Sequence, residues 1–298
     1  MRVAITGGTG FVGSELIKLL KERGDEVFIL SRNTHGYTEG ITYIKWLTEG
    51  ATPEKELEGI DAIVNLAGES INNGRWTNEQ KKKIYDSRMQ ATDEVLRILK
   101  TLQQKPTALI NASAIGIYPA STKNVYTEKS GELGTDFLAK TVYDWEQKAK
   151  LAEHYGVRVA FGRFGIILGK NEGALPLIAL PYKMFVGGPI GSGQNWMSWI
   201  HIRDVASALL FSIEHTIDGA FNVVAPDAKK MNDFGKTLAT VLKRPHYFPV
   251  PALALKIALG EKSQLVLEGQ HVKPKSLIEN GFVFEFPDLP KALADIYS

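Results

Sequence analysis

The chain of 298 residues contains no cysteine, which excludes disulfides, thiolate zinc sites and cysteine nucleophiles. It also lacks an apolar run long enough to cross a bilayer or to act as a signal peptide. Neither sign of charge dominates, because 35 basic and 33 acidic residues leave a net charge of +2 without a long basic run. These absences predict a cytoplasmic protein whose partners are neither nucleic acids nor membranes.

Metal-binding motifs are missing as well. The 6 histidines are not clustered, and neither an HExxH motif nor a calcium-binding loop occurs. We therefore expect no metal ion. The sequence leaves open whether the chain forms a homo-oligomer.

Short β-rich apolar runs alternate with helical patterns through the first half of the chain. With 44% hydrophobic residues, the chain has ample material for a core. The strands are expected at residues 2–6, 26–30, 62–66, 108–113 and 157–164, and the helices at residues 11–23, 77–104 and 136–154. Strands separated by helices predict a Rossmann-type, doubly wound parallel α/β sheet.

The pattern becomes less regular after Gly169. We expect helices over 174–185 and from Arg203, a loop over 187–193 and a strand over 221–225. Towards the C-terminus, the alternation of Phe282, Phe284 and Phe286 predicts a strand, followed by a last helix over 289–296.

A glycine-rich loop joins the first strand to the first helix. It comprises Gly7, Gly8, Thr9, Gly10, Phe11, Val12 and Gly13. Residues without a Cβ let backbone N–H groups at the helix N-terminus approach a pyrophosphate, and the last glycine lets helix and strand pack closely. Strand, loop and helix in this order predict a dinucleotide site; a tight turn without a ligand is the alternative.

Two further strand ends refine the expected cofactor. Ser31 and Arg32 stand where an NAD-specific site usually offers a carboxylate to the ribose hydroxyls. Arg32 is suited to bind a 2′-phosphate, which favours NADP(H) over NAD(H), unless it is simply a solvated surface arginine. Leu66, Ala67 and Gly68 follow the strand at 62–66, at the sheet edge where such folds bind ligands.

The combined motifs resemble those of extended short-chain dehydrogenase/reductases. They are TGGTGFVG at 6–13, NLAG at 65–68, residues 113–118, Arg163-Phe164-Gly165, and Trp199-Ile200-His201 with Asp204. A narrower resemblance is to the atypical subgroup called "epimerase family protein". It is carried by Gly68-Glu69, Arg75-Trp76, Ser87-Arg88, Asp144-Trp145-Glu146, Val272, Pro274, Gly281-Phe282 and Phe284.

The resemblance implies a Rossmann domain at 1–169, to which 199–225 return. It also implies a smaller α+β C-terminal substrate lobe built from 170–198 and 226–298. It adds Glu69, Arg88, Phe164 and Gly165 to the expected cofactor contacts.

The usual catalytic groups of that family are missing. Aligning Glu146 with the glutamate that commonly follows the Tyr-x-x-x-Lys pair puts Leu138 at the tyrosine position and Val142 at the lysine position. Ala114 stands where a hydroxyl residue is usual. Hydride transfer to a carbonyl still requires a proton donor or an oxygen-polarising group.

Four residues are candidates for this missing role: Tyr118, Ser113, Lys140 and Arg88. Each also has a structural alternative, such as lining a cleft passively or facing solvent.

Other side chains are expected on the substrate side. Arg75-Trp76 pairs a planar cation with an aromatic ring, which suits an anionic or ring-bearing ligand. Gln194 and Trp196, after a second glycine-rich stretch, and Tyr118 are further candidates. His201 is expected to be a packed structural histidine rather than part of a catalytic dyad.

Two functions therefore remain open. One is an NADP(H)-dependent oxidoreductase or epimerase-like protein acting on an unidentified small molecule with an unusual proton donor. The other is a non-catalytic NADP(H)-binding sensor or regulatory protein, which the missing Tyr-x-x-x-Lys pair favours.

Overall fold

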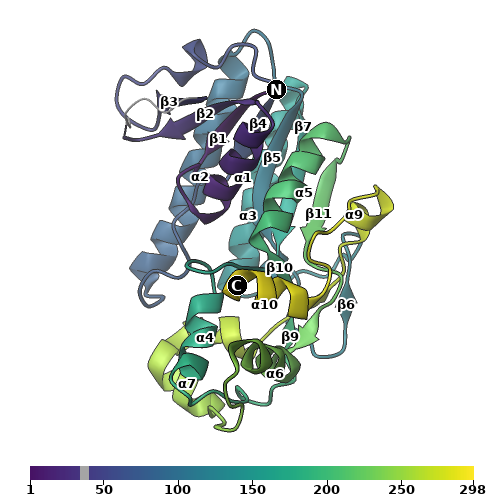
Figure 1. Ribbon diagram of the computed structural model, residues 1–298. Coiled ribbons are helices and arrows are strands. Elements are labelled where there is room, and N and C mark those ends of the chain that lie inside the picture. Colours follow the sequence, from purple (N-terminus) through teal and green to yellow (C-terminus); the bar gives the residue numbers. More distant parts are fainter. Residues whose placement is uncertain (34–39) are drawn as a thin grey trace.

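A parallel sheet of seven strands forms the centre of the first lobe in the computed structural model, which describes residues 1–33 and 40–298 (Figure 1). Its order is β11 (Gly219–Val223), β7 (Arg158–Phe164), β5 (Ala108–Ala114), β4 (Ala62–Asn65), β1 (Arg2–Thr6), β2 (Glu26–Ser31) and β3 (Ile41–Lys45). The chain order reverses at β1, whose neighbours are β4 and β2. The predicted doubly wound α/β fold is confirmed, and its ligand-binding crevice is expected at this reversal.

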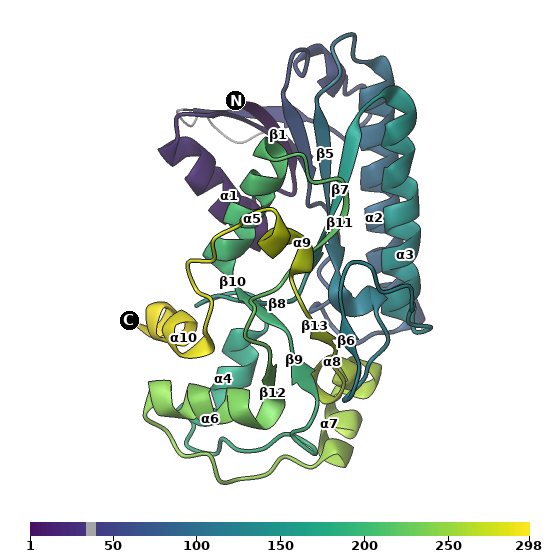
Figure 2. The ribbon, with the colours of Figure 1, turned by 90° about the vertical axis from the view of Figure 1, so that its right-hand side faces the viewer.

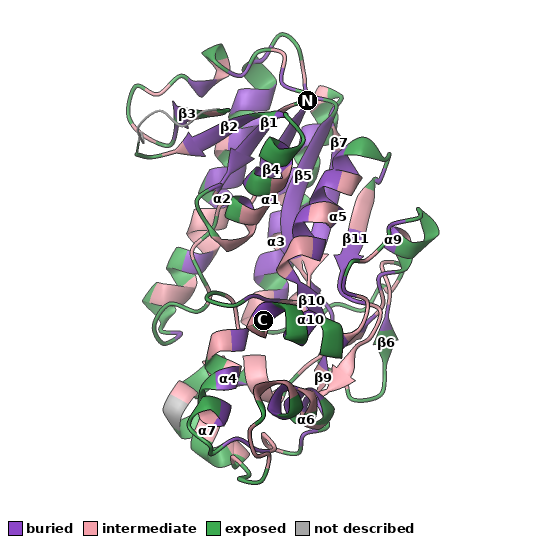
Figure 3. Ribbon diagram, in the orientation of Figure 1, coloured by how far each residue is buried: buried purple, intermediate pink, exposed green. Residues whose placement is uncertain are grey.

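Helices cover both faces of the sheet (Figure 2). α1 (Phe11–Glu22) and α5 (Ile202–Glu214) pack on one face, and α2 (Asn78–Thr101) and α3 (Phe137–Lys150) on the other. Leu16, Ile17 and Leu20, spaced for one helical face, are the apolar side chains that α1 buries. Because both faces are covered, the strand residues are buried nearly throughout (Figure 3).

A second lobe lies at the carboxyl edge of the sheet. Its helices are α4 (Leu175–Lys183), α6 (Met231–Leu242), α7 (Ala252–Leu259), α8 (Gln264–Leu267) and α10 (Leu289–Tyr297). α9 (Lys275–Glu279) instead packs beside β11 and buries Leu277 in the core of the sheet (Figure 1). The strand pairs of the second lobe are β8 (Ile166–Leu168) with β10 (Trp199–His201), β9 (Trp196–Met197) with β12 (Lys229–Lys230), and β6 (Val125–Tyr126) with β13 (His271–Val272). Short 3-10 helices lie at η1 (Pro53–Lys55), η2 (Ile115–Ile117), η3 (Leu151–Tyr155) and η4 (Gly260–Ser263). Between α4 and α6 the chain returns to the first lobe as α5 and β11.

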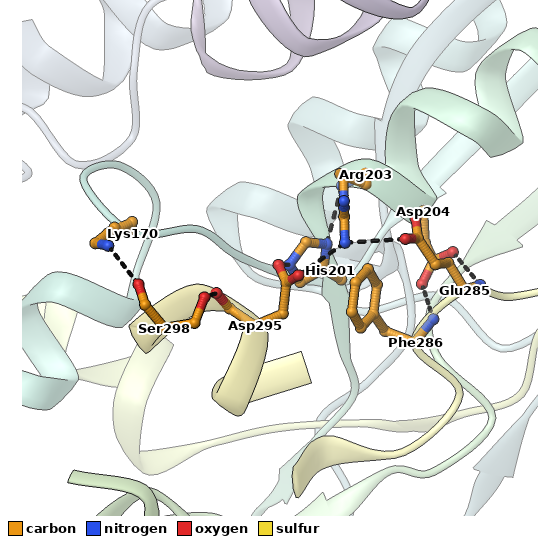
Figure 4. A network of polar contacts seen from close by, with 8 residues as sticks. All are labelled: Lys170, His201, Arg203, Asp204, Glu285, Phe286, Asp295 and Ser298. Carbon is orange, nitrogen blue, oxygen red and sulfur yellow. Dashed lines mark hydrogen bonds and ion pairs between the residues drawn. The ribbon is translucent and has the colours of Figure 1, made fainter. Parts of the chain in front are cut away.

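The expected strand through Phe282, Phe284 and Phe286 is wrong. The backbone N–H groups of Glu285 and Phe286 donate to the Asp204 carboxylate, over 2.8 and 3.0 Å, instead of joining a ladder (Figure 4). Phe282 packs with the core of the sheet and Phe286 with the core of the second lobe. The alternation therefore reflects burial in two different cores.

His201 lies where β10 meets α5, as Figure 4 shows. Its ring is 2% exposed, its Nδ1 accepts from the Arg203 N–H at 3.2 Å, and its Nε2 lies 3.3 Å from Asp295 of α10. Burial lowers the pKa of His201 to about 4, although the Asp295 carboxylate opposes this shift. The expected packed histidine is confirmed, and it helps to fix α10 to the first lobe.

Across residues 1–33 and 40–298, no helix has the length and apolarity to span a membrane. In the same ranges, no three His, Asp or Glu side chains gather as a metal-binding group.

Candidate functional site

The glycine loop brings three parts of the backbone into close contact. Gly7 has a φ of +66°, and a Cβ there would lie 2.9 Å from the backbone of Leu66. A Cβ on Gly13 would lie 2.5 Å from the Gly7 oxygen. Any larger residue at either position would push the loop away from the turn after β4 or α1 away from β1.

The N-terminus of α1 has free donor groups. Its N-cap is Gly10, which supplies no side-chain hydrogen bond, and the first turn has no acidic residue. Backbone N–H groups at this end therefore lack intrahelical partners and, with the helix dipole, favour an anion. Thr9 and Gly10 are exposed, so a ligand can reach them. Phe11 packs against Gly173, where a Cβ would lie 3.0 Å from its ring, and so ties the loop to the second lobe.

A buried polar network fixes the turn after β4. The Thr6 hydroxyl donates to Asn65 Oδ1 at 2.6 Å and accepts from the N–H groups of Leu66 and Ala67 at 3.1 Å each. Asn65 in turn donates to Asn111 at 2.7 Å. The network joins β1, β4 and β5 and holds Leu66 and Ala67 beside the glycine loop.

Arg88 packs directly under Gly68. Its Nη1 donates to the carbonyls of Ile84 and Glu69 at 2.8 and 3.1 Å, and its guanidinium lies 5.2 Å from the centre of the Trp145 ring. The Glu69 carboxylate lies near enough to favour the charged form of Arg88. Burial lowers the pKa of Arg88 to about 10, which leaves it charged at neutral pH. The Glu69 carboxylate also accepts from Asn73 at 2.8 Å.

The end of β2 presents a second group of exposed polar side chains. Arg32 is exposed, and the partly buried Ser31 hydroxyl accepts from the Asn33 N–H at 3.2 Å. Parallel pairing places Lys45 of β3 opposite Ser31, and Lys45 is also exposed. Sequence reasoning missed Lys45, because only the strand register brings it to this site. Residues 34–39, the continuation of this loop, lie outside the described residues.

Ser113 and Tyr118 lie inside a closed network. Ser113 donates to Glu146 at 2.5 Å, and Arg163 forms two contacts of 2.8 Å with the same carboxylate. Arg163 also donates to the Tyr118 hydroxyl at 2.8 Å, and that hydroxyl donates to Asn222 at 2.9 Å.

Both candidate hydroxyl residues are out of reach of solvent, since Ser113 is 3% exposed and Tyr118 is 1% exposed. Burial raises the pKa of Tyr118. Burial alone would lower the pKa of Arg163, but Glu146 raises it above its usual value.

α3 carries no acid–base pair at the positions expected for one. Val142 is buried with Ile115, Ile117 and Tyr118, and Leu138 is partly buried. Lys140 is exposed on the outer face of the helix. The three candidate catalytic residues from this part of the fold therefore do not converge on one site. Ser113 and Tyr118 are buried, whereas Lys140 is exposed.

The expected substrate residues differ in exposure and in the contacts that they make. Trp76 is 8% exposed and donates its indole N–H to the Ile71 carbonyl at 2.9 Å, whereas Arg75 is exposed. Trp196 stacks on His271 at 3.9 Å, with the Lys230 ammonium 4.0 Å from its ring centre. Gln194 is exposed beside it.

Phe164 and Gly165 connect the sheet to the second lobe. Phe164 is partly buried against the cores around Trp145 and the sheet. A Cβ on Gly165 would collide with the Ser198 carbonyl, and the Gly165 N–H donates to Val223 at 3.1 Å. Gly165 thus permits β8 to leave β7 and pair with β10.

A Rossmann-type sheet, a glycine loop at its topological switch point and a small lobe over its carboxyl edge together define a dinucleotide-binding protein of the extended short-chain dehydrogenase/reductase class. The model of the NAD dependent epimerase/dehydratase family matches residues 3–224, and a domain of unknown function (DUF1731) matches residues 250–296. The chain belongs to this epimerase/dehydratase family, in the group of epimerase family proteins.

Individual relatives agree with this placement. The chain is 46% identical over 298 residues to the epimerase family protein YfhF of Bacillus subtilis, covering 99% of this chain and 98% of that protein. It is 33% identical to the human epimerase family protein SDR39U1, whose crystal structure with NADPH superimposes with a TM-score of 0.89 and covers 99% of both chains. UDP-glucose 4-epimerase of Thermus thermophilus, solved with NAD, shares the fold at 17% identity and a TM-score of 0.79, covering 100% of this chain and 99% of that one.

Proposed function

We propose that this protein binds NADP(H) between the glycine loop and the end of β2, as an epimerase- or oxidoreductase-like protein acting on a small molecule. The observation that carries the proposal is the pairing of an uncapped N-terminus of α1 with the partly buried Ser31 and the exposed Arg32 and Lys45. The helix end suits a pyrophosphate, and the two cations suit a 2′-phosphate. The NADPH in the structure of human SDR39U1 supports this choice over NAD.

The remaining sequence candidates fit into this proposal as the surroundings of the cofactor. Leu66, Ala67, Gly68 and Glu69 form the turn beside the glycine loop, and Phe164 and Gly165 lead into the second lobe. Bound NADP(H) would supply or accept a hydride. Of the four catalytic candidates, Arg88 is assigned the polarisation of a substrate oxygen, because it packs against Gly68 and keeps its charge there. Ser113 and Tyr118 then act as positioning residues.

Titration calorimetry with NADPH and NADH tests the cofactor assignment. Arg32→Ala should weaken NADPH binding by roughly 10- to 100-fold, the range for a charge-assisted hydrogen bond, and Lys45→Ala by a smaller factor. NADH binding should change little in either variant. Lys18→Ala, an exposed lysine on the outside of α1, serves as the control. Equal losses for both cofactors would contradict the 2′-phosphate site.

A non-catalytic NADP(H)-binding regulator is the second candidate. It is favoured by the enclosure of Ser113 and Tyr118 and by the apolar Val142 at the lysine position. A panel of ketones, aldehydes and nucleotide sugars, followed by the absorbance of NADPH, separates the two candidates. Oxidation of NADPH that is lost in Arg88→Met supports the enzyme; tight binding without turnover on any compound supports the regulator.

A further inference from the structure

Large apolar side chains are exposed at the end of the second lobe, far from the glycine loop along the chain. They are Leu177, Leu180, Met184, Phe185 and Val186 in and after α4, Tyr247 and Phe248 before α7, and Leu253 and Ile257 in α7. Tyr247 is 78% exposed and Ile257 72%. A large exposed apolar patch of this kind is typical of a surface that binds another protein, a membrane or a ligand.

The segments that carry these residues are neighbours in space. The N–H groups of Tyr247 and Phe248 donate to the Gly187 carbonyl at 2.9 and 3.2 Å, and that of Val250 donates to Pro189 at 2.8 Å. The segment that follows α4 therefore lies beside the segment that precedes α7, and both helices lie in the part of the second lobe farthest from the sheet (Figure 1). None of the described side chains of α7 is buried, although most of them are apolar.

The same surface is cationic. Lys236, Lys243, Arg244 and Lys256 lie between residues 234 and 260, a stretch without aspartate or glutamate. Just before it, Asp233 lies 4.0 Å from the Lys236 ammonium, and just after it Glu261 pairs with Lys81 of the first lobe. Lys243, Arg244 and Lys256 therefore supply the positive charge of this surface. An open groove of about 520 Å³ lies at the end of α6 and is lined by Lys236, Lys243, Arg244 and Tyr247. The Arg244 guanidinium lies 4.3 Å from the centre of the Phe185 ring, so charge and apolar surface adjoin.

Hydrogen bonds hold His246, which lines the groove, in place. His246 is held on both ring nitrogens, by the Tyr182 hydroxyl at 3.0 Å and by Asn232 at 3.1 Å. A Cβ on Gly235 would lie 2.5 Å from the Tyr182 oxygen, which shows how closely these groups pack. The cationic side chains therefore project from a fixed base.

We propose that this surface, formed by residues 177–186, 236–248 and 253–257, docks peripherally on an anionic lipid bilayer. Apolar side chains enter the boundary of the acyl chains, while the lysines and Arg244 stay at the level of the headgroup phosphates. Charge complementarity selects this occupant. A second copy docked face to face would place cations against cations. This contact needs no membrane-spanning run, and it revises the expectation that no membrane is a partner.

Co-sedimentation with lipid vesicles tests the proposal on the full chain. The protein should pellet with phosphatidylcholine vesicles containing about 30% phosphatidylglycerol and not with pure phosphatidylcholine, and roughly 300 mM NaCl should release it. Lys236→Gln/Lys243→Gln/Arg244→Gln should reduce partitioning about a hundredfold. Leu253→Gln/Ile257→Gln should reduce it at least tenfold, with an unchanged unfolding temperature because both side chains are exposed.

The matched control is Lys18→Gln/Lys100→Gln/Lys150→Gln, which removes the same charge from exposed positions of the first lobe. It should leave partitioning unchanged, and all variants should bind NADPH like the unmodified protein. Equal loss in the control, equal binding to both vesicle types, or no binding to either would overturn the proposal. A dimer in light scattering that Leu253→Gln/Ile257→Gln dissociates would also overturn it, by showing a second copy on this surface.

Discussion

Two regions on the same edge of the sheet differ in whether their polar groups are exposed or buried. Around β1, α1 and β2, the helix end is uncapped and Arg32 and Lys45 are exposed. Around β5, α3 and β7, the hydroxyls of Ser113 and Tyr118 are sealed by the Glu146–Arg163 ion pair, whose side chains are 7% and 11% exposed.

The difference separates two properties that usually occur together in this class of protein. A cofactor-binding edge needs donors that stay free until a ligand arrives. A proton relay needs titratable groups that reach the substrate. Here the position aligned with the family's lysine holds the apolar Val142, and the neighbouring hydroxyls of Ser113 and Tyr118 are enclosed with the buried ion pair. The two regions therefore differ in which polar groups a ligand can reach.

The largest loss of stability is expected from removing the Glu146–Arg163 ion pair in the region around β5, α3 and β7. Arg163→Met leaves the buried Glu146 carboxylate without its cation, which should cost about 3–5 kcal/mol of unfolding free energy. The unfolding temperature, measured by calorimetry, should fall by roughly 10 °C. Glu146→Gln combined with Arg163→Met should recover part of the loss, because the uncompensated charge is removed. A stable single variant would mean that the ion pair does not hold this region.

A smaller loss of stability, together with a clear loss of NADPH affinity, is expected from Gly13→Ala in the region around β1, α1 and β2. The new Cβ would lie 2.5 Å from the Gly7 oxygen, and the resulting shift of α1 should cost about 1–3 kcal/mol. NADPH affinity in titration calorimetry should fall at least tenfold, because the N–H groups of α1 leave their positions. Gly131→Ala is the control, since nothing lies within 4 Å of a Cβ there. Unchanged NADPH binding in Gly13→Ala would refute the role of the loop.

The smallest effect concerns His201, a buried titratable group that belongs to neither region. Its folded pKa of about 4 lies below the usual 6.5 because burial disfavours the charged ring. The neutral ring therefore makes its full contribution to the free energy of unfolding above pH 6.5. This contribution is lost as the pH falls towards 4, and the loss amounts to about 2 kcal/mol at pH 5. His201→Asn, which keeps an acceptor for the Arg203 N–H, should flatten the fall of unfolding temperature between pH 7 and pH 5.

The control for this measurement is His154→Asn, at an exposed position. It should keep the pH dependence of the unmodified protein. If both variants have the same slope, the titration of His201 does not control stability in this range.

The sequence predicted most of the first lobe. The hydrophobic periods are strong there, the glycines stand between a strand and a helix, and the elements observed at 2–6, 11–22 and 26–31 agree with those expected. The same reasoning predicted a strand from the alternation of Phe282, Phe284 and Phe286, and that prediction was wrong. A period of two arises whenever alternate side chains are buried, whether a ladder or the Asp204 carboxylate binds the backbone.

By itself, the sequence determined the class of fold, the glycine loop and the absence of the Tyr-x-x-x-Lys pair, because each depends on residues close together along the chain. Only the tertiary structure brought Lys45 beside Ser31, enclosed Ser113 and Tyr118 around Arg163, and gathered the cationic apolar surface of the second lobe. Those arrangements depend on strand register and on packing between distant segments. Neither leaves a local pattern in the sequence, and both decide which polar groups remain free to meet a ligand.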